Sequence, residues 1–195
     1  MTRFIIITVL PGATARLFDG ARRLVGRIGS SRAALAYPPH VTLRTGVLVP
    51  DDMVDFFIDE FGDLLGHWAP FTVATEGIFC STYLDGQVRK NIVGYRVRKD
   101  AALAALNQRL LAYVSWRASD RLAFEPHLTL AFDDLGAEGA QAVSRWREAN
   151  PRVLPDRFQW TCDNVTLCRK IGDKWELFAS WRAGVASTAP STGAN

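Results

Sequence analysis

One seven-residue pattern occurs twice in this chain, and it restricts the possible fold more strongly than any other feature. The first copy, Tyr37 to Leu43, has the sequence YPPHVTL, and the second, Phe124 to Leu130, has the sequence FEPHLTL. Both follow the order aromatic, any residue, proline, histidine, aliphatic, threonine, leucine. They begin at residues 37 and 124, which are 87 positions apart. This spacing is too long for a solenoid repeat, so the pattern indicates a duplicated half-domain.

Strand geometry gives the two copies the same arrangement. Alternate residues of a strand point to one side, so His40 and Thr42 share a face, and so do His127 and Thr129. Their aliphatic neighbours point the other way, into apolar packing. If a pseudo-two-fold axis relates the halves, two imidazoles and two hydroxyls converge on one cleft.

These side chains fit displacement at phosphorus. In-line attack needs a base on the attacking oxygen and an acid on the leaving oxygen, and histidine can serve in either role near neutral pH. Threonine hydroxyls can donate to the non-bridging oxygens and stabilise the charge that develops there. A single His-x-Thr in a strand usually has no function, but two copies in matched contexts use two of the chain's three histidines. We therefore interpret both copies as functional.

The two Pro-His-aliphatic-Thr-Leu segments resemble the motifs of the two-histidine (2H) phosphoesterase superfamily. That superfamily includes the bacterial 2′-5′ RNA ligase-like proteins and the 2′,3′-cyclic nucleotide phosphodiesterases. The resemblance covers most of the chain, and it implies a bilobal fold with pseudo-two-fold symmetry and chemistry without a metal or other cofactor. It also implies catalytic roles for His40, Thr42, His127 and Thr129. Following the resemblance, we assign the base role to His127 and the acid role to His40, although the sequence alone is symmetric.

Other residues near the motifs are weaker candidates. Strand alternation places Arg44 on the face of Thr42, where it could contact a phosphate, although a solvated strand end explains it equally well. Tyr37 and Phe124 each lie three residues before a histidine and could stack on a base, but core packing is the commoner fate of such aromatic residues. His67 has no His-x-Thr context, and we interpret it as structural, near a helix C-terminus.

Hydrophobic periodicity predicts an α+β fold of about seven strands and four helices. With the resemblance, the expected architecture is a bilobal duplicated fold in which antiparallel sheets line a central cleft and the helices lie outside. Strands are expected over residues 3–9, 40–43, 71–79, 91–98, 126–130, 157–168 and 175–181, and helices over 13–28, 50–65, 100–114 and 138–148. We expect one domain over residues 1–183 and a disordered tail over 184–195, which is rich in Ser, Thr, Ala, Pro and Gly.

Composition excludes several classes of function. The net charge of +3 is too small for a protein that coats DNA. Cys80, Cys162 and Cys168 form no CxxC pair, which favours a reducing cytoplasm, and the apolar run over residues 4–10 is too short to span a bilayer. The histidines and cysteines lack the spacing of a zinc site, so no metal is expected. There is no P-loop and no dinucleotide fingerprint, which argues against an ATP-driven ligase.

The sequence therefore predicts an enzyme that cleaves an RNA 2′,3′-cyclic phosphate or a 2′-5′ phosphodiester. Joining of 2′-5′ ends would be the reverse of cleavage, without ATP. The expected partner is an RNA terminus or a nucleotide with a cyclic phosphate, with no membrane and with a monomer favoured. Two alternatives stay open: a non-catalytic module that binds a nucleotide or RNA end, and a cyclic phosphodiesterase of a small metabolite. Two intact titratable bases favour an enzyme over a binding module.

Overall fold

A computed structural model describes residues 1–65, 68–114, 124–172 and 174–184 of the 195-residue chain. The main elements are β1 (Thr2–Val9), α1 (Gly12–Gly29), β2 (His40–Val49), α2 (Val54–Leu65), β3 (Phe71–Asp85), β4 (Val88–Val97), α3 (Ala101–Val114), β5 (His127–Phe132), α4 (Ala137–Ala149), β6 (Gln159–Cys162), β7 (Asn164–Ile171) and β8 (Lys174–Arg182). Short 3₁₀ turns at Ala33–Ala36 and Asp51–Met53 precede β2 and α2.

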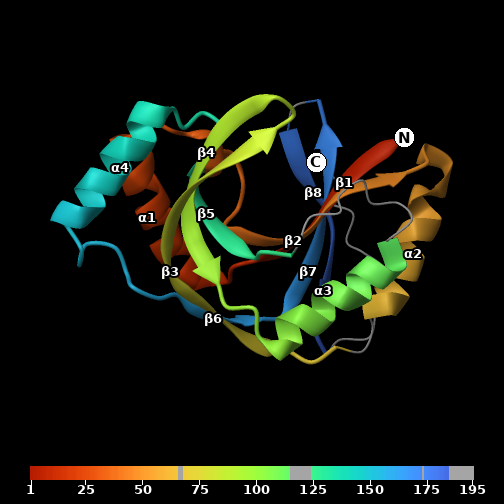
Figure 1. Cartoon of the computed structure of the whole chain (residues 1–195). Coiled ribbons are helices and arrows are strands. Elements are labelled where there is room, and N and C mark those ends of the chain that lie inside the picture. Colours follow the sequence, from red (N-terminus) through yellow and green to blue (C-terminus); the bar gives the residue numbers. More distant parts are fainter. Residues whose placement is uncertain (66–67, 115–123, 173, 185–195) are drawn as a thin grey trace.

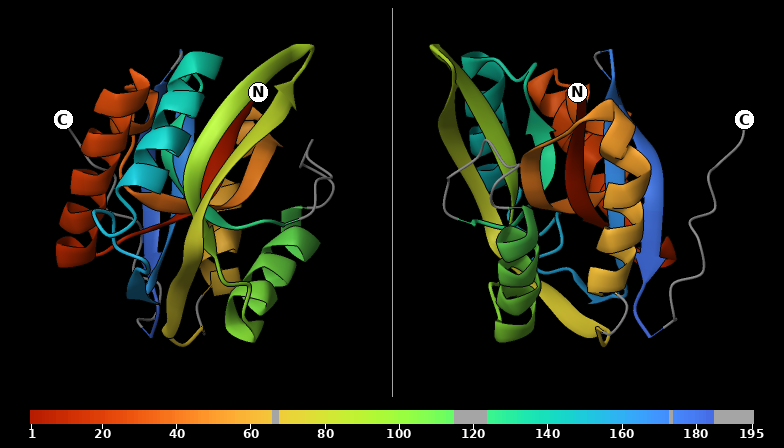
Figure 2. Two further views of the ribbon diagram at one scale, coloured as in Figure 1. Left: turned by 60° about the vertical axis from the view of Figure 1, so that its left-hand side comes forward. Right: turned by 90° about the vertical axis from the view of Figure 1, so that its right-hand side faces the viewer.

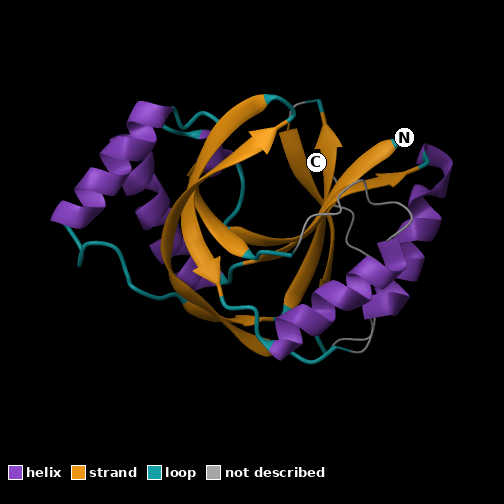
Figure 3. Ribbon diagram, in the orientation of Figure 1, coloured by secondary structure: helices purple, strands orange, loops and turns teal. Residues whose placement is uncertain are grey.

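The strands form one antiparallel sheet in the order β6-β3-β4-β5-β2-β1-β7-β8. Figure 1 shows that this sheet curls, and Figure 3 shows the helices on its outer side. The predicted α+β class, with antiparallel strands and outer helices, is confirmed. The two expected sheets are joined into one because β2 pairs with β5.

The strand order is symmetric about the β5–β2 pair, with three further strands on either side. Each histidine motif begins one of these two central strands. The helices exchange between the halves: α1, from the first half of the chain, packs on β5 and α4, whereas α3, from the second half, packs on β2. The two further views in Figure 2 show α1 and α4 on one side of the molecule and α2 and α3 on the other. This exchange links the two halves.

The helices fold because each presents apolar residues at intervals of three and four. On α1 these include Phe18, whose ring centroid lies 6.2 Å from that of Tyr95 on β4. On α2 they include Phe61, whose ring centroid lies 5.0 Å from that of Trp181 on β8. The buried apolar side chains of the described residues from both halves form one cluster. A shared core holds the two central strands in a fixed relation.

The helical segments predicted over residues 50–65 and 100–114 differ in how their first turns are held. Asp100 caps α3, since its Oδ1 accepts a hydrogen bond from the backbone N–H of Leu103 at 3.0 Å. The helical segment that contains α2 does begin near Asp51, but the Asp51 carboxylate makes no capping bond. It accepts a hydrogen bond of 2.7 Å from the Thr2 hydroxyl instead. Asp51 therefore ties the start of this segment to β1.

The strand predicted over residues 157–168 is wrong as one element. It divides at Asp163, because β6 pairs with β3 at one edge of the sheet whereas β7 pairs with β1 on the other side. The change of partner occurs at Asp163, which pairs in neither ladder. Its carbonyl accepts a hydrogen bond of 2.8 Å from the N–H of Ala183. The single-residue connection brings the edge strand β6 close to the far half of the curled sheet.

Candidate active site

The two motifs alternate in burial as the sequence predicts. On β2, His40 and Thr42 are half-buried, while Val41 and Leu43 are only 1% and 2% exposed. On β5, His127 and Thr129 are half-buried, and their neighbours Leu128 and Leu130 are buried. The aliphatic residues join the core beneath the helices. The histidines and threonines therefore occupy the opposite face, the inner face of the curled sheet, away from the helices.

The register of the central strands brings the motifs together. Val41 pairs with Leu128 in antiparallel sense. The residues that flank this pair, His40 and Thr42 on β2 and His127 and Thr129 on β5, therefore lie near one another. His40 and His127 are close enough for their charges to interact. All four predicted residues form one group on a single face.

Both imidazoles are held by a carbonyl two residues earlier in the chain. Nδ1 of His40 lies 2.7 Å from the carbonyl oxygen of Pro38, and Nδ1 of His127 lies 2.9 Å from that of Glu125. A carbonyl only accepts, so Nδ1 carries the hydrogen in both rings. This fixes the tautomer and leaves Nε2 as the nitrogen that can exchange a proton with a substrate.

The prolines of the repeated pattern explain why this arrangement occurs twice. Pro39 and Pro126 immediately precede the histidines, and a residue before proline is confined to extended conformations. The carbonyls that hold the imidazoles belong to those restricted residues. The proline carbonyls are also matched: that of Pro39 accepts from the N–H of Leu10, and that of Pro126 accepts from the N–H of Val97, each at 2.9 Å. The two halves thus share the backbone support of their histidines.

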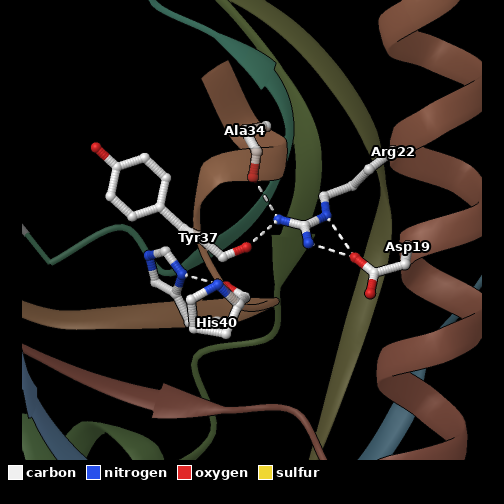
Figure 4. A network of polar contacts seen from close by, with 6 residues as sticks. Asp19, Arg22, Ala34, Tyr37 and His40 are labelled. Carbon is white, nitrogen blue, oxygen red and sulfur yellow. Dashed lines mark hydrogen bonds and ion pairs between the residues drawn. The ribbon is translucent and has the colours of Figure 1, made fainter. Parts of the chain in front are cut away.

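A buried arginine holds the segment that leads to His40 (Figure 4). Arg22 on α1 is 5% exposed. Its Nη1 donates to the carbonyl oxygens of Ala34 and Tyr37 at 2.5 and 2.9 Å, and its Nε donates to Asp19 at 3.0 Å. The sequence interpretation missed Arg22, although its signal was present: an arginine on the apolar stripe of α1 requires buried acceptors.

The surroundings of His40 lower its pKa below the ordinary value of 6.5. The main cause is burial, which disfavours the charged imidazolium. The positive charges of Arg22 and His127 lower the pKa further, whereas the hydrogen bond to Pro38 acts in the opposite direction. His40 is therefore biased toward the neutral form, and the two histidines are close enough to interact electrostatically.

The two aromatic residues of the pattern have different environments. Tyr37 is half-buried, with its ring centroid 6.3 Å from that of His40 and 6.2 Å from that of Phe132. Burial raises the pKa of Tyr37, and the charge of Asp133 adds to this, so its hydroxyl stays protonated at neutral pH. Phe124 packs against the hydrophobic core. Of the two, Tyr37 is the one beside a histidine.

Arg44 does not share the face of Thr42, so this prediction is wrong. Ile7 of β1 pairs with Thr42, and its neighbour Ile6 pairs with Arg44, with a register shift between the two pairs. Neighbouring residues of a strand face opposite sides, so the irregularity turns Arg44 away from Thr42. The side chain of Arg44 is 6% exposed. Arg44 is therefore buried on the side of β2 opposite to Thr42.

Two residues that the sequence interpretation missed lie beside His127. Arg96 on β4 pairs directly with His127, so it shares the inner face. Phe79 on β3 has its ring centroid 5.8 Å from the imidazole of His127, in an edge-on arrangement. The guanidinium of Arg96 lies 5.5 Å from the centroid of the Phe79 ring. No sequence signal marks these residues, because their position depends on the pairing of separate strands.

Further expectations concern residues outside this group. His67 lies outside the described residues, and so do positions 185–195 of the expected tail. In the described part of the chain, Cys80, Cys162 and Cys168 are free thiols, and no three His, Cys, Asp or Glu side chains are grouped as a metal site would require. No helix among the described residues is long and apolar enough to cross a membrane.

Solved structures share the fold of this chain. TT0787 of Thermus thermophilus superposes with a TM-score of 0.64 at 15% identity, covering 92% of this chain and 97% of that one. E. coli LigT in complex with 3′-AMP gives a TM-score of 0.57 at 15% identity, covering 93% and 98%. Usb1 of Kluyveromyces marxianus gives 0.57 at 11% identity, covering 89% and 96%. These identities are low, so the likeness concerns the fold.

Sequence comparison gives the family. A candidate phosphoesterase of Bacillus cytotoxicus is 28% identical over 154 residues, which are 77% of this chain and 81% of that protein. A similar protein of Bacillus cereus is 29% identical over 112 residues, 56% of this chain and 60% of that protein. The sequence pattern of the 2′-5′ RNA ligase superfamily matches residues 11–174, which include both histidine motifs. The resemblance to two-histidine phosphoesterases is thus confirmed, and the chain belongs to the 2′-5′ RNA ligase superfamily.

Proposed function

We propose that this protein is a metal-independent phosphodiesterase that acts on RNA 2′,3′-cyclic phosphate ends or on 2′-5′ phosphodiester linkages. One observation carries the proposal. His40 and His127 lie on paired central strands and share one face, and each has Nδ1 bound to a backbone carbonyl. This arrangement supplies two imidazoles whose Nε2 atoms can take and give protons on either side of a phosphorus atom.

In the forward reaction, Nε2 of one neutral histidine removes a proton from water, and the water oxygen forms a bond to phosphorus. The bond from phosphorus to the ribose oxygen breaks, and the other histidine donates its proton to that oxygen. A 2′,3′-cyclic phosphate thus becomes a monoester. Thr42 and Thr129 donate hydrogen bonds to the non-bridging oxygens, whose charge increases in the transition state. With the 5′-hydroxyl of a second RNA end in place of water, the same forward steps form a bond from that oxygen to phosphorus and break the bond from phosphorus to the 3′ oxygen, which gives a 2′-5′ phosphodiester without ATP.

The two roles are assigned as the family resemblance implies, with His127 as base and His40 as acid. The lowered pKa of His40 counts against its acid role in the free protein, because an acid must hold its proton when the substrate binds. A bound phosphodiester carries a negative charge, which raises the pKa of a nearby imidazole. Protonation of His40 is therefore coupled to substrate binding in this proposal.

The comparisons support a nucleotide or RNA end as the substrate. E. coli LigT, which shares the fold, has been solved with 3′-AMP, with ATP and with phosphate. The Bacillus cytotoxicus relative is named as a candidate phosphoesterase. A 3′-nucleotide has the chemistry of a product of 2′,3′-cyclic phosphate hydrolysis, so a shared fold that accepts 3′-AMP is consistent with this substrate.

The test measures turnover of three substrate classes after dialysis against a strong chelator: 2′,3′-cyclic mononucleotides, 2′-5′ dinucleotides and RNA with a 2′,3′-cyclic phosphate end. We expect turnover of at least one class, and His40→Ala and His127→Ala should each lower it by about 10²–10⁴-fold. Thr161→Ala, an exposed substitution on β6, is the control and should leave turnover unchanged.

Four results would count against the proposal. Full activity in either histidine variant would remove the acid–base pair. Activity that disappears with the chelator and returns with zinc or manganese would replace it with metal chemistry. Binding of these nucleotides without turnover would favour the binding module, and turnover confined to another small cyclic phosphodiester would favour a metabolite enzyme.

A further inference from the structure

The two halves of the site differ at one equivalent position. On β1, Val9 pairs with His40, and on β4, Arg96 pairs with His127. The next residues, Leu10 and Val97, each donate to the carbonyl of the proline that precedes the histidine. Val9 and Arg96 are therefore counterparts under the pseudo-two-fold symmetry. The His40 side carries an apolar residue there, while the His127 side carries a cation.

The side chain of Arg96 is exposed, yet it is held in place. Its guanidinium lies over the ring of Phe79 at 5.5 Å from the centroid, and that ring makes a T-shaped contact with the imidazole of His127. A cation over an aromatic face is stabilised by the ring's negative face. The position of Phe79 is possible because it pairs with Gly94, which has no side chain on this face. A Cβ atom at Gly94 would lie 3.2 Å from the Phe79 ring.

Arg96 has no carboxylate within ion-pair distance among the described residues. Its donors are thus available to an anion that approaches the inner face. A planar guanidinium with several N–H groups suits the oxygens of a phosphate. Because Arg96 covers one face of Phe79, that face is closed to a base, which argues against Phe79 as a stacking platform there.

We infer that Arg96 is a substrate-binding residue that recognises a second phosphate of the substrate, one nucleotide away from the phosphodiester held by His40 and His127. The inference rests on the proposed function, because it assigns a further substrate group to the same site. In an RNA 3′ end, this second phosphate is the 5′-phosphate of the terminal nucleotide. The preferred substrate is then an oligonucleotide end or a 5′-phosphorylated nucleotide, oriented with its 5′ side toward β4.

A binding measurement tests this without relying on turnover. Isothermal titration calorimetry would compare adenosine 3′,5′-bisphosphate with adenosine 3′-monophosphate. The wild-type protein should bind the bisphosphate at least about tenfold more tightly, the size of one charge-assisted hydrogen bond. Arg96→Met should remove this preference by weakening only the bisphosphate. Arg145→Met, an exposed substitution on α4, is the matched control and should keep it.

Three binding results would overturn the inference: equal affinities for the two nucleotides in the wild type, a preference that survives Arg96→Met, or no binding of either nucleotide. A preference that survives because Arg96→Met weakens both nucleotides equally would place Arg96 against the base or the 3′-phosphate instead.

A parallel turnover assay separates this inference from the proposed function. Adenosine 2′,3′-cyclic phosphate is compared with and without a 5′-phosphate, and kcat/KM should be about tenfold higher with it in the wild type only. An Arg96-dependent binding preference without any turnover would contradict the proposed function and leave the Arg96 site standing. Turnover that is equal with and without the 5′-phosphate, together with equal affinities, would contradict the Arg96 site and leave the proposed function standing.

Discussion

Val41 on β2 lies directly across from Leu128 on β5, and this pairing sets the relation between the two histidine motifs. Both residues are buried, with exposed fractions of 1% and 0%. Packing of their side chains into the core turns the flanking histidines and threonines to the inner face. The fold thus uses an apolar contact to position the four polar side chains.

The threonines should contribute to turnover rather than to stability. Thr42→Val and Thr129→Val keep the shape and the strand propensity of the side chain but remove the hydroxyl donor. Each should lower kcat by about 10²-fold, the scale of a donor that stabilises charge in the transition state. Steady-state kinetics and thermal unfolding check this together. Lower stability with unchanged kinetics would assign that hydroxyl to structure alone.

Gly94→Ala should destabilise the protein because β4 and β5 approach too closely for a side chain there. A Cβ at this position would lie 2.6 Å from the backbone oxygen of Leu128. We expect a loss of about 1–3 kcal/mol in the free energy of unfolding, as for other overpacked sites, measured by urea denaturation. The control is Gly20→Ala in α1, which has open space and should add about 0.5–1 kcal/mol. An unchanged midpoint in Gly94→Ala would contradict the close approach.

One of the three cysteines should react rapidly in the native protein. Cys80 is exposed, whereas Cys162 and Cys168 are buried. Burial raises the pKa of the Cys162 thiol to about 11 and that of Cys168 to about 12, and the thiolate is the reactive form. A chromogenic disulfide reagent at pH 8 should therefore label one thiol quickly, and all three after denaturation. Cys80→Ser should lose the fast phase, and two or more fast thiols in the native wild type would contradict the packing.

His40 should make the fold sensitive to mild acid. Its pKa in the folded state is below the value of 6.5 expected for the unfolded chain, so the unfolded state binds more protons as the pH falls below about 6.5. The free energy of unfolding must then decrease on acidification and level off below the folded pKa. His40→Asn should remove this contribution, giving a shallower decrease below about pH 6.5 in denaturant titrations.

The paired measurement has an internal reference. Asp51 and Asp134, whose pKa values are lowered from 3.8, lose their contributions only in stronger acid. Both proteins should therefore share the further decrease that begins near pH 3.8. If His40→Asn and the wild type decrease in parallel over the whole range below pH 6.5, the pKa of His40 is not lowered by folding.

The sequence predicts those parts of the fold that depend on local pattern. The repeated motif indicated His40 and His127 because its chemistry lies in neighbouring residues along one strand. Arg44 was misplaced because a register shift on β2 interrupts the alternation, and such an irregularity leaves no mark in residue order. The break at Asp163 was missed because apolar residues continue on both sides while the strand changes partner. Arg96 and Phe79 could not be found because they reach the site through pairing between distant strands.

The central claim is that His40 and His127 divide acid and base roles, and a pH–rate profile tests it most directly. One histidine must be neutral and the other charged, so kcat/KM for a 2′,3′-cyclic nucleotide should rise and fall around two apparent pKa values of the pair. The optimum should lie near or below the ordinary histidine pKa of about 6.5, because burial lowers the pKa of His40 in the free enzyme. The substrate keeps one negative charge over this range and adds no inflection.

The histidine variants then assign the roles in the same measurement. Loss of the base should abolish the acid limb of the residual rate, and loss of the acid should abolish the alkaline limb. The account predicts that His127→Ala loses the acid limb and His40→Ala loses the alkaline limb. Exchange of the two limbs would reverse the roles and keep the pair. A flat wild-type profile between pH 5 and 9, with chemistry shown to limit the rate, would contradict acid–base catalysis by these histidines.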